Sequence, residues 1–100
     1  MCFDLCTVKV IAVSRPVTRP IAELAPLLPE EARTVWALYT EDVVRETYLR
    51  DDGGVVLVIE AETLEAATAS LSRLPLVANG FLEFDVWAVR PFAPWGRLMA

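Results

Sequence analysis

Residues 74–91, LPLVANGFLEFDVWAVRP, are the stretch that decides the fold class of this chain. The Leu-Pro pair at its start predicts the end of a helix, and a strand is expected over 81–90 after a short connector. Side chains two residues apart point to the same side of a sheet, so the strand has one apolar and one polar side. The apolar side carries Leu82, Phe84, Val86 and Ala88, and the polar side carries Glu83, Asp85 and Trp87.

The rest of the chain supplies three more strands and two helical regions. Alternation predicts a strand over 3–13, and a proline-punctuated loop follows over 14–20. Pro26 and Pro29 predict a short helical segment over 21–28 and a better helix over 29–42. Further strands are expected over 43–50 and 55–61, and Thr63 can cap a helix that ends at Leu74. The order βαββαβ indicates an α+β, ferredoxin-like sandwich with a four-stranded antiparallel sheet.

Composition limits the classes of function. The 100 residues predict one domain, 1–100, and the 55% hydrophobic content favours additional burial between subunits. No apolar run of about 20 residues and no secretory leader is visible, so we expect a cytoplasmic protein without a membrane span. The net charge of −5 without a basic cluster argues against nucleic-acid binding. The absence of histidine excludes imidazole-based triads and most zinc sites, and no metal or cofactor is expected.

The turn at 51–54, DDGG, sets the predicted pairing of the second and third strands. A four-residue turn places Arg50 opposite Val55, and therefore Arg45 opposite Glu60 at ion-pairing distance. One bulge in the second strand would instead bring Glu46 and Tyr48 to this side of the sheet. The side away from the helices is then expected to carry Thr7, Lys9, Arg45, Thr47, Val56, Val58, Glu60, Glu83, Asp85 and Trp87.

This polar sheet side has two interpretations. It can be solvated, or neutralised by ion pairs in an oligomer interface. Alternatively, two such sheets enclose a cleft in a dimer, where a partly desolvated carboxylate has a raised pKa and an arginine holds an anion. Trp36 and Tyr39 lie at helical spacing, which is more typical of a core than of a ligand contact. Glu30 and Glu31 are typical of a solvated helix start.

The segment 58–91, VIEAETLEAATASLSRLPLVANGFLEFDVWAVRP, resembles the muconolactone isomerase-like family. The shared pattern is an acidic residue ending a strand, a short helix, LPL, and a strand with two alternating carboxylates before a proline. The resemblance implies a ferredoxin-like subunit that dimerises into an α/β barrel around a cleft. It also implies a proton shift on a small organic molecule without metal or cofactor, with Glu60, Glu83, Asp85 and Arg45 at matching positions.

Three functions therefore remain open. The first is a cofactor-free isomerase using acid–base proton transfer on a small anionic substrate. The others are a cofactor-independent oxygenase or cyclase on an aromatic or polyketide-like substrate, and a non-catalytic binding or assembly module. The apolar tail, 91–100, is expected to pack on the domain or on a neighbouring subunit. The candidate catalytic residues are Glu83, Asp85 and Glu60, and the candidate substrate-binding residues are Arg45, Lys9, Trp87, Tyr48, Trp36 and Tyr39.

Overall fold

The computed structural model describes residues 7–91 of the chain. The two cysteines, Cys2 and Cys6, lie outside these residues. So does the predicted tail, except for its first residue, Pro91. The elements in order are β1 (Val8–Ser14), α1 (Ile21–Leu24), the 3₁₀ turn η1 (Ala25–Leu27), α2 (Leu28–Thr40), β2 (Val44–Leu49), β3 (Val55–Ala61), α3 (Leu64–Leu71), α4 (Pro75–Ala78) and β4 (Phe84–Val89).

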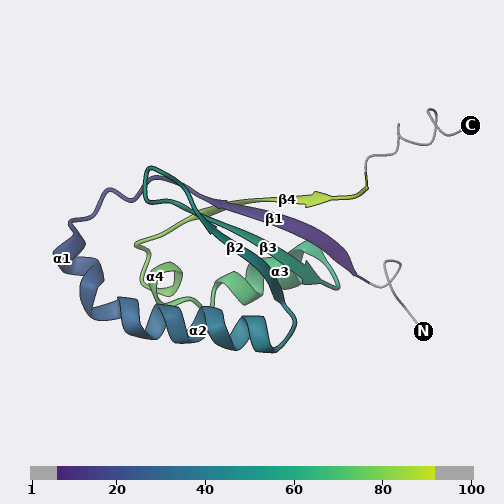
Figure 1. Ribbon diagram of the computed structural model, residues 1–100, viewed down its shortest axis with the longest axis horizontal. Helices are drawn as coiled ribbons and strands as arrows, with labels where there is room; N and C mark the ends of the chain where they lie inside the picture. The colour runs from purple at the N-terminus through teal and green to yellow at the C-terminus, as the bar shows by residue number, and fades with distance from the viewer. Residues whose placement is uncertain (1–6, 92–100) are drawn as a thin grey trace, which may run out of the picture.

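The four strands form one open antiparallel sheet in the order β2-β3-β1-β4. Helices α2 and α3 lie on one side of this sheet, and the other side is left uncovered by the described residues (Figure 1). The arrangement is α+β and is compatible with the ferredoxin-like fold predicted from the order of elements. The uncovered side is called the open face below.

The main core lies between the sheet and α2 and α3. Alternate residues of β1, β3 and β4 point toward the helices, as the period of two predicts. Thr63 caps α3 as predicted, because its hydroxyl accepts a hydrogen bond from Ala66 N at 3.0 Å. The buried core consists of Val10, Ala12, Leu38, Val44, Leu57, Ile59, Ala67, Leu71 and Leu74.

Prolines divide the first helical region as predicted. Pro26 lies in η1, where it separates α1 from α2, and Pro29 lies in the first turn of α2, where its missing N–H costs no hydrogen bond. Helix α2 ends where Asp42 adopts a positive φ of 64°. Val43 N then donates to Leu38 O at 2.9 Å, which satisfies a carbonyl at the end of the helix.

The predicted connector before the last strand is a helix, α4. Pro75 starts it, since its fixed φ suits the first helical position. Phe81 N and Leu82 N then donate to Leu76 O, at 2.8 and 3.2 Å. These residues are therefore tied to α4, and β4 begins at Phe84 rather than at residue 81.

The predicted register of β2 with β3 is wrong by one residue at the turn. Arg50 N donates to Gly54 O at 2.7 Å, which closes a three-residue loop, and Leu49 rather than Arg50 pairs with Val55. A β-bulge then lies between Val44 and Glu46. As a result Thr47 and Leu49 point toward the helices, and Glu46 and Tyr48 point to the open face.

Candidate functional site

Arg15, in the loop after β1, binds both carboxylates of the acidic strand segment. Its Nη2 lies 2.8 Å from Asp85 Oδ1, and its Nη1 lies 3.0 Å from Glu83 Oε2. The backbone adds a third link, because Arg15 N donates to Glu83 O at 2.8 Å. The structure thus brings Glu83 and Asp85 together as predicted, but around an arginine that sequence reasoning did not include.

Arg15 also changes the acidity of Asp85. Its hydrogen bonds and its positive charge hold the pKa of the Asp85 carboxyl below its ordinary value. A proton-transferring carboxylate in a cleft was expected to have a raised pKa. In the single chain, the pKa of Asp85 is instead below its ordinary value.

Glu60 and Arg45 form an ion pair, although their predicted register is wrong. Arg45 Nη2 lies 3.3 Å from Glu60 Oε2, and Arg45 Nε donates to Asp42 O at 3.0 Å. Arg45 lies in the bulge and is not paired with a residue of β3. Its side chain therefore reaches Glu60 from outside the regular strand pairing. On β1, Lys9 is the residue opposite Glu60.

The three candidate carboxylates do not form one cluster. Lys9, opposite Glu60, and Val13, opposite Asp85, are four residues apart on β1, which is about 13 Å at about 3.3 Å per residue. Trp87 lies between these two ends, opposite Ile11. The strip between the two charged groups is apolar and consists of Ile11, Val13, Val56 and Val58, with Trp87 on β4 and Tyr48 on β2 beside it.

Tyr48 and Trp87 are half-exposed on the open face, with 55% and 54% of their surface accessible. The Tyr48 hydroxyl donates a hydrogen bond to the carboxylate of Glu46. A bulge does occur in β2, between Val44 and Glu46, but Tyr48 rather than Thr47 lies on the open face because Leu49 and not Arg50 pairs with Val55 at the turn.

Trp36 and Tyr39 are on the surface of α2 rather than in the core. Their exposed fractions are 64% and 51%, and their ring centroids lie 5.5 Å apart. The interpretation of this pair as core residues is wrong, because the apolar stripe of α2 that meets the sheet runs through Leu38 and Val35 instead.

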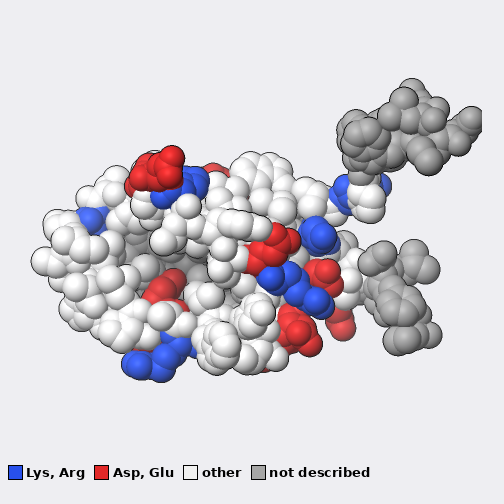
Figure 2. Space-filling model, viewed as in Figure 1, with Lys and Arg blue, Asp and Glu red and all other residues white. Residues whose placement is uncertain are grey.

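An apolar hollow lies between α2 and the helix-facing side of the sheet. It has a volume of about 580 Å³, in the range of ligand pockets. Figure 2 shows a hollow in this part of the molecule, bordered mostly by uncharged residues with acidic atoms inside it. We call it the α2 cavity; its lining is Glu31, Ala32, Val35, Thr47, Tyr48, Leu49, Val55, Leu57, Leu74, Leu82 and Phe84.

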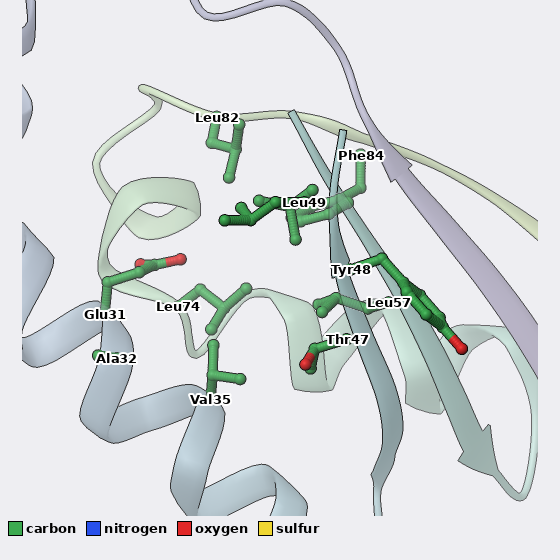
Figure 3. Close-up of a pocket in the computed structure, with 11 residues that line it drawn as sticks. Glu31, Ala32, Val35, Thr47, Tyr48, Leu49, Leu57, Leu74, Leu82 and Phe84 are labelled. Carbon is green, nitrogen blue, oxygen red and sulfur yellow. The ribbon is translucent and has the colours of Figure 1, made fainter. Parts of the chain in front are cut away.

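The tight turn between β2 and β3 shapes the wall of the α2 cavity. By pairing Leu49 with Val55 it turns Leu49 toward the helices, and Figure 3 shows Leu49 pointing into the cavity while the Tyr48 ring points away from it. Leu49 is nevertheless 80% exposed. Leu49 therefore adds apolar surface that water still reaches at the wall of the cavity.

Glu31 is the acidic residue that reaches into this cavity (Figure 3). Its carboxylate is half-buried, and Oε1 accepts a hydrogen bond from Leu76 N in the first turn of α4, at 3.0 Å. Burial raises the pKa of the Glu31 carboxyl, and the hydrogen bond from Leu76 offsets only part of that effect.

Sequence reasoning missed Glu31 by treating it as a solvated helix start. A signal was present, because Glu31 lies four residues before Val35 and seven before Leu38, on the apolar stripe of α2. A carboxylate at such a position loses water when the helix packs on the sheet. Its neighbour Glu30 stays exposed.

Comparisons of the chain with protein-family models, with curated proteins and with solved structures found no match. Over residues 7–91, no three Cys, Asp or Glu side chains are placed to hold a metal ion. In the same part of the chain, no helix has the length and apolar character needed to cross a membrane.

Proposed function

We propose that this chain is a muconolactone isomerase-like, cofactor-free enzyme that transfers a proton within the α2 cavity, with Glu31 as the acid–base group. The observation that carries the proposal is a half-buried carboxylate of raised pKa at the wall of an apolar, ligand-sized cavity. The proton leaves one carbon of the substrate for Glu31 and returns to another, so no co-reactant is needed.

The contacts of Glu31 suit this role. Leu76 N–H holds Oε1, and the described residues provide no hydrogen-bond donor for Oε2, which is left for the substrate. Thr47 supplies the second polar side chain of the cavity, and its hydroxyl can donate to a substrate oxygen. Because the proton is taken next to a carbonyl in such reactions, a nearby hydroxyl donor stabilises the charge that develops on oxygen.

The lining favours an uncharged substrate over the anionic one expected from the sequence. No Lys or Arg is among the residues that line the α2 cavity, and Arg45 lies on the β2 bulge and pairs with Glu60. An anion beside Glu31 would meet a carboxylate without a counterion. An uncharged carbonyl compound with an apolar body fits the lining better.

Solvent-deuterium exchange into a panel of small unsaturated ketones and lactones, followed by mass spectrometry, tests the proposal. We expect exchange with the wild-type protein, its loss in Glu31→Gln, and its retention in Glu30→Gln, which changes an exposed carboxylate one residue away. Equal exchange in wild type and Glu31→Gln would remove Glu31 from the reaction.

We further propose that a second copy of the chain covers the open face, as the family resemblance implies. The support is the apolar strip around Ile11 and Val58, which Trp87 and Tyr48 flank in water. Trp87→Glu should convert a dimer to a monomer in analytical ultracentrifugation, whereas Tyr39→Glu, an equally exposed aromatic on α2, should not. A wild-type monomer at micromolar concentration would contradict this arrangement.

An oxygenase or cyclase acting on an aromatic substrate is the second candidate. It is favoured by an apolar cavity that continues toward Trp36 and Tyr39. Trp87, the third aromatic expected near such a cavity, lies on the open face instead. Oxygen uptake measured with aromatic substrates separates an oxygenase from isomerisation, which consumes no oxygen, and chromatography of the products detects a cyclase.

A further inference from the structure

A second hollow continues the α2 cavity along the side of α2. It has a volume of about 420 Å³ and is lined by Ala32, Val35, Trp36, Tyr39 and Thr47. Ala32, Val35 and Thr47 line the α2 cavity as well. The two hollows therefore lie side by side against these shared residues, between Glu31 and the aromatic pair.

The aromatic pair forms a surface suited to a flat ligand. Trp36 and Tyr39 have centroids 5.5 Å apart and ring planes inclined by 31°, so the two rings support each other and still present faces to solvent. Both rings are more than half exposed, which leaves a large apolar area in water. No charged side chain lines this second hollow.

The helix sets the distance between the two ends of the site. Trp36 and Tyr39 follow Glu31 by five and eight residues, which is about 8 to 12 Å along an axis that rises about 1.5 Å per residue. A ligand that touches both Glu31 and the aromatic pair must therefore be longer than one six-membered ring.

We propose that the site binds an elongated, uncharged, multi-ring aromatic molecule, with its distal ring stacked on Trp36 and Tyr39. Trp36 then determines specificity for ligand length. The inference rests on the proposed function in one respect, since it places the reacting end of the ligand at Glu31. The absence of Lys and Arg from both linings argues against an anionic ligand.

Affinities for three matched probes, phenol, naphthol and hydroxyanthracene, test the proposal by isothermal titration calorimetry. Affinity should rise with ring number in the wild-type protein. Trp36→Ala should weaken the two larger probes by about three- to ten-fold, the range expected for one lost aromatic contact, and leave phenol within about two-fold. Trp36→Phe should restore part of the loss, and Trp87→Ala on the open face should change none of the three affinities.

The proposal is overturned if Trp36→Ala weakens all three probes equally, or none of them, or if the wild-type protein does not favour the longer probes. A fall in oligomer mass in Trp36→Ala with unchanged probe affinities would also overturn it, because it would assign the aromatic pair to contact with a second copy. Proton exchange in Glu31→Gln is measured separately. Unchanged exchange there refutes the proposed reaction without altering the dependence of affinity on ring number.

Discussion

The carboxylate of Glu31 on α2 accepts a hydrogen bond from Leu76 N on α4 at 3.0 Å, across 45 positions of sequence. The contact joins α2, which lines the cavity, to α4, whose flanking residues Leu74 and Leu82 line it (Figure 3). Oε1 satisfies a backbone donor at the start of α4, where an intrahelical partner is lacking. The same carboxylate therefore supports the fold with one oxygen and leaves the other available for chemistry.

The burial of Glu31 predicts how stability depends on pH. Its folded pKa is raised above the ordinary value of 4.5, so its contribution to stability is fully present below that value and is lost as pH rises through the folded pKa. The free energy of unfolding of wild type relative to Glu31→Gln should fall with increasing pH over this window and then level off.

Urea unfolding at intervals from about pH 4 to 8 measures this difference. Glu30→Gln is the matched control, because the Glu30 side chain is exposed and pairs only with Arg33 on the helix surface. A difference between wild type and Glu31→Gln that stays constant across the range would contradict the raised pKa.

The contact with Arg15 predicts the opposite pH dependence of stability for Asp85. The folded pKa of Asp85 is below its ordinary value of 3.8, so its contribution to stability is present above that value and is lost as pH falls through the folded pKa. In Arg15→Gln the pKa of Asp85 should return toward the ordinary value. Carboxyl carbon chemical shifts followed by NMR report this titration directly.

Arg19→Gln is the control for the Asp85 titration. Arg19 is in the same loop, but it pairs with Glu23 and lies over the Phe81 ring, so its removal should leave Asp85 unchanged. An Asp85 titration curve identical in wild type and Arg15→Gln would show that the Arg15 contact does not persist in solution.

The hairpin between β2 and β3 depends on the absence of a side chain at Gly54. A Cβ there would come within 2.4 Å of Arg50 Nη2, and Arg50 would have to leave Ser14 O, which its Nη1 contacts at 2.7 Å. Gly54→Ala should therefore lower the urea midpoint, and most of that loss should disappear in an Arg50→Ala background. Equal losses in both backgrounds would contradict the steric explanation.

Gly53 offers a contrast in the same hairpin. Its φ is 87° and a Cβ there would meet nothing within 4 Å, so Gly53→Ala should cost about 1–2 kcal/mol through backbone strain alone. Because Arg50 is not involved, Arg50→Ala should not reduce this cost. The same urea series measures both glycines.

Two leucines of α2 should differ sharply in their effect on stability. Leu38 is fully buried in the main core, and Leu38→Ala should lower the free energy of unfolding by about 2–5 kcal/mol through lost burial and a residual cavity. Leu28 is 41% exposed at the start of the helix, and Leu28→Ala should cost well under half as much. Similar losses of stability in the two variants would contradict the packing of α2 in which Leu38 is buried and Leu28 is partly exposed.

Much of the fold followed from local patterns. The strand over Val55–Ala61 was predicted with its observed bounds, because a run rich in β-branched residues after two glycines is a local signal. Pro26 and Pro29 located the break before α2, and Thr63 located the start of α3. Helix α4 was missed because four residues after a proline carry too little periodicity to be distinguished from a connector.

The register of the β2–β3 hairpin could not be predicted from the sequence pattern. The turn closes through Arg50 and Gly54 rather than one residue later, and a bulge at Arg45 offsets the pairing again. Alternation fixes which residues share a side only within an unbroken strand. The Arg45–Glu60 ion pair still forms, because long side chains tolerate such a shift.

The sequence by itself determined the βαββαβ order without α4, the apolar side of β1, β3 and β4, and the start of α3, because these depend on residues within a turn or strand of one another. Only the tertiary structure decided the surroundings of the candidate groups and the direction in which their pKa values shift. Arg15 reaches Asp85 across 70 positions, and α2 packs so that Glu31 loses water. Desolvation and ion pairing depend on contacts between segments that are far apart in the sequence. The α2 cavity likewise forms only where such segments meet.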